Sequence, residues 1–295
     1  MDISEHYKKY CESLGLKFTM DNKVNPYDDT TLFCPAGMQQ FKKEFNSDAT
    51  GTRSNIQTCI RLKDLDEIGD GTHFLSFNMM GLFSFRDWEL QDAVDFWMNF
   101  LEKTINLKVD YVTIHPDKFE EWKELYSSYS VDIRMDDECI WTDGDIGGYC
   151  TEFYKDDIEI GNIVSPLGTC IDAGFGLERL QSFFSSDSPP SKEEILIDAC
   201  EQILNSGYFP GNKEQGYILR KLLRELYKSG SSWGNSHYNK ERLRQDKVIR
   251  RYFKNKDKKS YANKPREWWF DTMGVDLDFI DNLSPDNIAK IISKQ

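Results

Sequence analysis

The 295-residue chain lacks any long apolar run. None of its hydrophobic stretches approaches the roughly 20 residues that a helix needs to cross a bilayer. Its first residues, MDISEHYKKYCESLGLKF, have neither the basic start nor the apolar core of a signal peptide. We therefore expect a cytoplasmic protein that has no membrane partner.

Paired cysteine motifs are missing too. The seven cysteines are scattered and include no CxxC pair, so neither a disulfide scaffold nor a zinc ribbon is indicated. We expect reduced, mostly buried thiols and no structural zinc. The seven are Cys11, Cys34, Cys59, Cys139, Cys150, Cys170 and Cys200.

Several catalytic motifs are absent. There is no GxxxxGK[ST] phosphate loop, no GxSxG elbow and no HExxH sequence. With only four histidines, a histidine-based triad or metal cluster is not favoured. The glycines of GDGTHF and GDIGGY lack the strand and helix context of a dinucleotide fingerprint.

The chain has an excess of acidic residues. Its net charge of −13 argues against a protein that coats nucleic acid through bulk electrostatics. Lys and Arg nevertheless cluster in residues 213–266, which predicts a local basic surface. With 39% hydrophobic and 29% charged residues, the composition is that of a globular protein.

Periodicity divides the chain into two domains. The stretch 185–194 is rich in Ser and Pro, and the pattern after it is purely helical. Helices are predicted over 5–15, 89–105, 193–207, 215–230 and 240–255. Strands are predicted over 31–34, on both sides of the loop 62–73, over 109–116, over 158–168, and from 169 into a glycine-rich turn and a helix. We expect a mixed α/β domain over 1–187 and a basic helical domain over 192–295.

Two arginines stand on separate strand-to-turn elements. Arg61 ends the apolar run CIR, and Arg179 follows the glycines of DAGFGLERL. A guanidinium group binds phosphate oxygens in a bidentate way and keeps its charge, so two of them could hold two phosphates of one nucleotide. A surface ion pair remains an alternative for each, Arg61 with Asp64 or Arg179 with Glu178.

Several blocks, in order, resemble the alanyl-tRNA synthetase family of class II aminoacyl-tRNA synthetases. They are DDTTLFCPAGMQQFKKEF, CIRLKDLDEIG with THFLSFNMMGLFSF, CIWTDGDIGGYCTEFY, and IEIGNIV with IDAGFGLERL. The resemblance covers residues 5–185 and implies an α+β fold, with an antiparallel sheet flanked by helices, followed by a smaller all-helical domain.

The resemblance implies residue roles. Arg61 would hold the α-phosphate of ATP and Arg179 the γ-phosphate, and these two would be the catalytic residues. Phe77 would stack on adenine unless it is a core aromatic. The other implied ATP-binding residues are Lys63, Asp64 and His73.

The same resemblance implies an amino-acid pocket. Asp172 would bind the ammonium group of L-alanine, although an Asp before glycines is often only a turn residue. Trp141, Asn162 and Gly174 would line the pocket. Mg²⁺ would enter with ATP, and Glu152 and Asp145 are weak candidates to hold it.

Beyond the linker, FPGNKEQGYILRKLLREL and WWFDTMGVDLDFID resemble the tRNA-recognition domain of this family. Asn212 and Asp271 match the residues that read the acceptor-stem G·U pair of tRNA(Ala), whose guanine amino group is exposed in the minor groove. Arg220 is a further candidate for tRNA binding. Asn212 could instead be a helix N-cap.

These observations predict an alanine–tRNA ligase that uses ATP and Mg²⁺, L-alanine and the tRNA(Ala) acceptor stem. Two other functions stay open, an adenylate-forming ligase with a non-tRNA acceptor and a non-catalytic tRNA-binding paralogue. The chain stops before the family's editing and oligomerising domains, so a monomer without editing is expected. Such a pocket discriminates only about 10- to 200-fold against one small group, so serine should be mischarged.

The sequence departs from the family pattern at three places. Only one of the family's paired histidines is present, as His73, and the loop after Arg61 is shortened. Asn78 stands where a glutamate is usual. GDIGGYC replaces a longer Gly-Pro-Cys segment.

Overall fold

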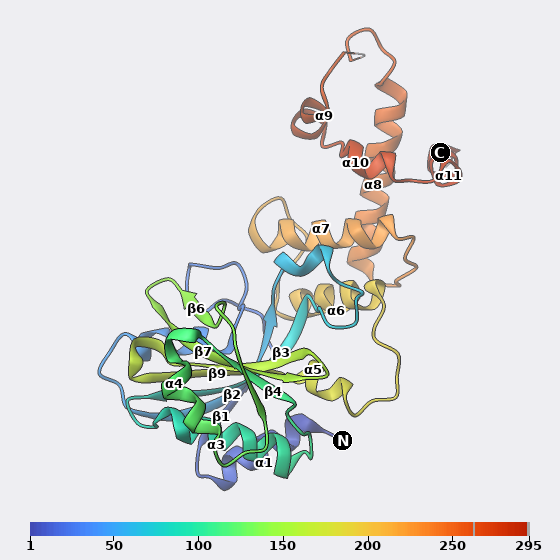
Figure 1. Ribbon diagram of the computed structural model, residues 1–295. Coiled ribbons are helices and arrows are strands. Elements are labelled where there is room, and N and C mark those ends of the chain that lie inside the picture. The colour runs from blue at the N-terminus through green and yellow to red at the C-terminus, as the bar shows by residue number, and fades with distance from the viewer. Residues whose placement is uncertain (262, 294–295) are drawn as a thin grey trace. The chain divides into compact units, whose positions relative to one another are not determined.

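The structure, a computed structural model, describes residues 1–261 and 263–293, without the side chains of Asp64, Phe270 and Asp271. It divides into two compact units, Met1–Pro190 and Ser191–Gln295 (Figure 1). The first contains a sheet and the second is helical. In the part of the chain that is described, no helix has the length and apolar character needed to span a bilayer.

The first unit is built on a mixed sheet, which has nine strands in the described residues. Its order is β1-β2-β3-β9-β8-β7-β4-β5, with β6 paired to β7. β1 joins β2 and β5 joins β4 in parallel, and the other pairs are antiparallel. The strands are β1 (Lys17–Asp21), β2 (Gly51–Ile60), β3 (Ser76–Phe85), β4 (Tyr111–Ile114), β5 (Asp132–Met135), β6 (Ile140–Asp143), β7 (Ile146–Lys155), β8 (Ile158–Val164) and β9 (Cys170–Gly176).

Helices cover one face of this sheet. The helical elements of the unit are α1 (Ile3–Ser13), η1 (Gly37–Phe41), α2 (Lys42–Phe45), η2 (Lys63–Asp66), α3 (Leu90–Met98), η3 (Asn99–Thr104), η4 (Pro116–Lys118), α4 (Phe119–Trp122), η5 (Lys123–Tyr126), η6 (Pro166–Gly168) and α5 (Leu177–Ser182). α1 and α3 lie side by side below the sheet in Figure 1. Tyr7 of α1 stacks on Trp97 of α3, which in turn stacks on Phe175 of β9.

Strand alternation separates this core from the opposite face. Successive side chains of a strand point to opposite sides. Met80 and Leu82 of β3 therefore belong to the helix-covered core, whereas Phe77 and Met79 line a cavity on the other face. On that second face η1 and α2 cover only part of the sheet, where Phe41 packs on Phe83 and Phe45 packs on Phe85. The uncovered part is where ligand-binding side chains can gather.

The structure corrects two of the predicted elements. Residues 31–34 do not form a strand. Within the described residues, the backbone hydrogen bonds of Cys34 join it to Val24 and Ile60. The glycine-rich turn expected in IDAGFG is also wrong, because Gly174 and Gly176 lie inside β9. The fold class itself is confirmed, with two parallel strand pairs added to the antiparallel sheet.

The second unit is formed by α6 (Lys192–Asn205), α7 (Glu214–Lys228), α8 (Ser236–Asn255), α9 (Arg266–Met273), α10 (Leu277–Asp281) and α11 (Pro285–Ser293). α6 begins with a capping box in which Ser191 and Glu194 bond each other's backbone N–H groups. α7 buries one leucine stripe, and α8 packs against α7 and α11. A cluster around Ile249, Trp269 and Phe279 completes the unit's core.

Candidate active site

A cavity of about 560 Å³ lies on the uncovered face of the sheet in the first unit. It brings together most of the residues that the sequence singled out. Those that line it are Arg61, Lys63, His73, Phe77, Trp141, Glu152, Asn162, Asp172, Gly174 and Arg179. They come from β3, β6, β7, β8, β9 and α5 and from the connection between β2 and β3.

Arg61 extends the β2–β3 ladder by one residue, since its backbone N–H donates to the carbonyl of Leu75 at 2.9 Å. Its Nε donates to the carbonyl oxygen of Pro35 at 3.0 Å. Its guanidinium carbon lies 5.0 Å from the centroid of the Phe77 ring. The cation is thus held by a carbonyl and an aromatic ring. Phe77 is half-buried in the cavity wall rather than in the core.

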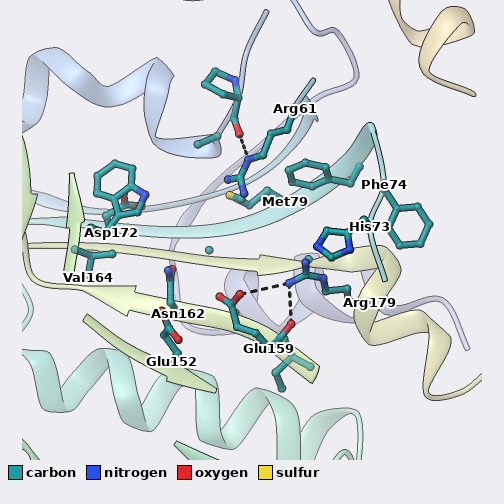
Figure 2. A pocket seen from close by; sticks show the side chains of 18 of the residues that line it. Arg61, His73, Phe74, Met79, Glu152, Glu159, Asn162, Val164, Asp172 and Arg179 are labelled. Atoms are coloured by element: carbon teal, nitrogen blue, oxygen red, sulfur yellow. Dashed lines mark hydrogen bonds and ion pairs between the residues drawn. The ribbon is translucent and has the colours of Figure 1, made fainter. Parts of the chain in front are cut away.

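Arg179, in the first turn of α5, approaches the same cavity from another element (Figure 2). Its Nη1 donates to the carbonyl of Glu159 at 2.8 Å and lies 3.5 Å from Oε2 of the same residue. Arg179 thus forms an ion pair with Glu159, while the carboxylate of Glu178 accepts hydrogen bonds from the Asn78 backbone N–H. Both arginine side chains face one space, with Arg179 about 30% exposed.

Asp172 is the buried carboxylate of the site, with 8% of its surface exposed. It lies within β9, opposite Phe83 and Val164. Burial and, to a smaller extent, the negative charge of Asp143 raise the pKa of Asp172 to about 7, while the Arg61 guanidinium acts in the opposite direction. No hydrogen bond reaches its carboxylate from the described residues. Such a group is suited to receive a cationic ligand.

Asp143, at the end of β6, lines the cavity and is held there by an ion pair with Lys42 of α2. The Lys42 ammonium lies 2.8 Å from Oδ2 of Asp143 and 3.2 Å from Oδ2 of Asp28. Although burial acts against its charge, its hydrogen bonds to Asp143 and Asp28 raise the pKa of Lys42. Lys42 therefore ties the β6–β7 hairpin to α2 and neutralises much of the charge of Asp143.

The loop between β2 and β3 supplies His73. Its Nδ1 lies 2.5 Å from Oδ2 of Asp70, and its Nε2 lies 3.1 Å from Oε2 of Glu67. The ring is therefore bracketed by two carboxylates at the cavity edge. Lys63 is exposed at the same edge. The predicted role of Asp64 concerns a side chain outside the described residues.

The predicted amino-acid pocket residues surround Asp172. Trp141 of β6, Asn162 of β8 and Gly174 of β9 all line the cavity, and Asn162 pairs with Gly174 across the strands. A Cβ atom at Gly174 would lie 2.9 Å from Sδ of Met79, so glycine keeps this floor open. These residues lie at the predicted pocket, and their roles remain predictions.

The two magnesium candidates differ in position. Glu152 lines the cavity, but its carboxylate lies among two thiols, and burial raises its pKa. Asp145 lies in the exposed turn between β6 and β7 and is not among the lining residues. Oxygen donors that suit Mg²⁺ are also supplied by Glu159, beside Arg179, and by Asn162.

In the second unit, Asn212 precedes α7 but does not cap it, because the N-cap is Lys213. The Asn212 Oδ1 instead accepts a hydrogen bond from Nη1 of Arg220. Arg220 also pairs with Glu241 of α8 at 3.2 Å. The side chain of Asp271 lies outside the described residues.

Sequence reasoning missed two carboxylates of the cavity, Asp143 and Glu159, and named a third, Glu178, only as an ion-pair partner of Arg179. Glu159 follows a turn and has no motif signal of its own. Asp143 belongs to TDGDIGG, which was interpreted as a glycine-rich segment rather than as the hairpin β6–β7. Strict strand alternation in IEIGN would place Glu159 and Asn162 on opposite faces, and it is the irregular β7–β8 register at Phe153/Tyr154 that lets both line the cavity.

The fold defines an α+β protein whose candidate ligand site lies on one face of a largely antiparallel sheet. Residues 2–165 match the family model described as tRNA synthetases class II (A), which is more than half of the chain. The chain therefore belongs to the class II tRNA synthetase family.

Curated relatives include alanine–tRNA ligases. The one from Endomicrobium trichonymphae is 29% identical over 294 residues, which cover 75% of this chain and 33% of that protein. The one from Francisella tularensis subsp. novicida is 28% identical over 315 residues, which cover 79% of this chain and 36% of that protein. The chain thus spans about one third of the length of these relatives.

Similar solved structures include two other synthetases. A pyrrolysyl-tRNA synthetase from Desulfitobacterium hafniense has 14% identity and a TM-score of 0.40, covering 62% of this chain and 67% of that one. The apo histidyl-tRNA synthetase of S. aureus has 10% identity and a TM-score of 0.41, covering 83% and 82%. The family assignment rests on the sequence match.

Proposed function

We propose that this chain activates L-alanine with ATP and transfers the alanyl group to the 3′ end of tRNA(Ala). The observation that carries the proposal is the cavity in which Arg61 and Arg179, from different elements, face one space beside the buried Asp172. Two fixed cations suit a polyphosphate, and a buried carboxylate suits an ammonium group. An amino acid and ATP together supply both.

In the activation step, a carboxylate oxygen of alanine attacks the α-phosphorus of ATP. A new P–O bond forms, the bond to the β-phosphate bridge breaks, and pyrophosphate leaves with the electron pair. Arg61 would stabilise the charge that builds on the α-phosphoryl oxygens. Because Arg61 is already held by Pro35 and Phe77, little reorganisation is needed at the moment of reaction. Arg179 would orient the γ-phosphate of the leaving group.

Asp172 would bind the alanine ammonium group and so place its carboxylate toward Arg61. The charged form of Asp172 is costly in the empty cavity and becomes favourable when a cation lies beside it. Trp141 and Asn162 would limit the side chain that fits. Lys63, Asp64, His73 and Phe77 would complete the ATP site, with Phe77 on the adenine.

The cavity's oxygen donors fit a magnesium ion carried by ATP. When bound, the ion would neutralise charge on the phosphates. Glu159 is the residue we assign to it, in place of Asp145, which does not line the cavity. The carboxylate of Glu159 already pairs with Arg179, so it would position both Arg179 and the magnesium ion beside the triphosphate.

We assign residues 1–187 to adenylation and residues 192–295 to tRNA acceptor-stem recognition. The second unit carries a net positive charge although the whole chain is strongly acidic, and this supports binding of a polyanion there. Asn212 and Asp271 would read the G·U pair. Arg220 would hold the Asn212 amide in place.

The test is ATP–pyrophosphate exchange with each amino acid in turn. We expect exchange with alanine, and a loss of at least about 10²-fold in Arg61→Ala. Arg134→Ala is the control, because Arg134 is half-exposed on the edge strand β5 and pairs with Asp132. No exchange with any amino acid would favour the non-catalytic paralogue.

A second experiment separates the acceptors. Asp271→Ala and Asn212→Ala should keep alanine-dependent exchange and reduce charging of tRNA(Ala), as should replacing the G·U pair. Equal loss of exchange and charging would contradict the domain assignment. Exchange without any tRNA charging would favour a ligase with another acceptor.

A further inference from the structure

Three potential metal ligands converge beneath the cavity, and the proposed function uses none of them as a set. The Sγ atoms of Cys139 and Cys150 and a carboxylate oxygen of Glu152 all lie within 4.8 Å of one another. Both thiols are buried and Glu152 is half-buried. We propose that Cys139, Cys150 and Glu152 form a zinc-binding site.

Strand pairing produces this set. Ile140 faces Tyr149 in the β6–β7 hairpin, so Cys139 and Cys150 follow as the next opposed pair, joined by a 2.9 Å bond from the Cys150 N–H to the Cys139 carbonyl. Glu152 is two residues beyond Cys150 on β7, so its side chain projects from the same face. The sheet therefore places three donors on one side without any help from a flexible loop.

The carboxylate is oriented toward the thiols. Tyr154 donates a hydrogen bond of 2.7 Å to Oε2 of Glu152, which leaves Oε1 as the oxygen 3.9 Å from the Cys150 sulfur. A hydrogen bond to the outer oxygen of a ligand carboxylate is the usual support of a metal site. The Oγ1 atom of Thr113, which is opposite Glu152 on β4, lies 3.1 Å from the Cys139 sulfur and helps to position it.

The donor set selects the metal class. Two thiolates and one carboxylate suit a borderline-soft divalent cation such as zinc and do not suit magnesium. Zn–S bonds of about 2.3 Å place two tetrahedral sulfur ligands about 3.8 Å apart, so the donors need to close by only a small rotation. Binding releases the two thiol protons, and the site then carries one net negative charge.

The fourth tetrahedral position would point to the cavity. Glu152 lines the cavity, and Trp141 packs against the two thiols while also lining it. A structural zinc site is closed by four protein ligands, whereas three leave a position for water or a ligand. The expectation of no zinc rested on the missing CxxC motif, and a hairpin brings together cysteines that no short motif joins.

The proposal is tested on the full chain, reduced and freed of metal, by titration with Co²⁺ followed by Zn²⁺. We expect one equivalent of Co²⁺ to give a thiolate charge-transfer absorption that Zn²⁺ abolishes. Cys139→Ala and Cys150→Ala should lose the band, and Glu152→Gln should weaken binding by about tenfold or more. Cys11→Ala is the matched control, because Cys11 is equally buried but lies in α1.

Several outcomes would overturn the site. They are the absence of a charge-transfer band in wild type at one equivalent, an equal loss in Cys11→Ala, or a band that survives in Cys139→Ala and Cys150→Ala. A Cys139–Cys150 disulfide that resists reduction, seen by thiol counting, would also contradict it. Because the readout is metal binding and not exchange, its failure would leave the proposed function untouched.

Discussion

The carboxylate of Glu178 on α5 is held by Asn78 on β3, one hundred residues earlier in the chain. The Asn78 backbone N–H donates to both carboxylate oxygens, at 3.0 and 2.9 Å, and its side-chain amide donates to Oε1 at 2.9 Å. This contact fixes the start of α5, the helix that carries Arg179. Asn78, which stands where a glutamate is usual in the family, therefore acts as a clamp on the helix that carries Arg179.

The clamp can be tested by adding one charge. Asn78→Asp places a carboxylate against Glu178, so we expect a loss of about 1 to 3 kcal/mol in the free energy of unfolding and a higher KM for ATP in exchange. Glu178→Gln in the same chain gives back a donor and should restore much of both. Urea unfolding and exchange kinetics measure the two effects, and a double variant no better than the single one would contradict the clamp.

Alanine binding should depend on pH through Asp172. Its pKa of about 7 means that the empty site is largely protonated at pH 6 and largely charged at pH 8. Since only the charged form attracts ammonium, KM for alanine should be about tenfold higher at pH 6 than at pH 8. Asp172→Asn should have a high KM with little pH dependence. A wild-type KM that stays constant across this range would count against the assignment.

The same carboxyl should reduce stability in the absence of ligand. A raised pKa means that the folded state holds its proton more tightly than the unfolded state, so this group's contribution falls as pH rises from about 4 to 7. Asp172→Asn should therefore unfold at a higher temperature than wild type at pH 8, and by a smaller margin at pH 5. Thermal unfolding without ligands measures this, and a lower Tm for the variant at pH 8 would be the contrary result.

Glu241 makes the second unit sensitive to loss of Arg220. Glu241 is 5% exposed; burial opposes its charge, but hydrogen bonds from Arg244 and Gln245 and the charge of Arg220 together lower its pKa. Arg220→Ala removes one of the two cations and should cost about 1 to 3 kcal/mol. Lys240 is exposed on α8, the helix that carries Glu241, so Lys240→Ala should change the free energy of unfolding by no more than about 0.5 kcal/mol. Equal denaturation midpoints for the two variants would contradict this role.

Individual residues of the site could be predicted from the sequence, but the contacts between residues far apart in the chain could not. Arg61 was predictable as a cation at the end of an apolar strand. Phosphate binding could be predicted for both Arg61 and Arg179, although the two are far apart in sequence. The pairs Asn78–Glu178 and Arg179–Glu159 could not be predicted, because no periodicity connects residues on different strands. β1 and β5 were missed although apolar residues alternate in both, because these edge strands have only five and four residues.

The β6–β7 hairpin was missed for a different reason. Its glycines suggest a loop, yet Gly147 and Gly148 lie in β7. A Cβ atom at Gly148 would collide with the carbonyl oxygen of Ser165, so the glycine serves a close approach between backbones. The residues that this hairpin positions, Asp143 and the two thiols, were hidden with it.

The ten-position pairing of β2 with β3 also limits how such a chain can change in length. Inserting or deleting one residue inside either strand would exchange the faces, turning Phe77 and Met79 into the helix-packed core and Met80 into the cavity. Residues 62–74 lie outside this strand pairing, so a gain or loss of residues can be absorbed there. Shortening this loop without changing the β2–β3 register therefore leaves Arg61 and the cavity residues Phe77 and Met79 in place.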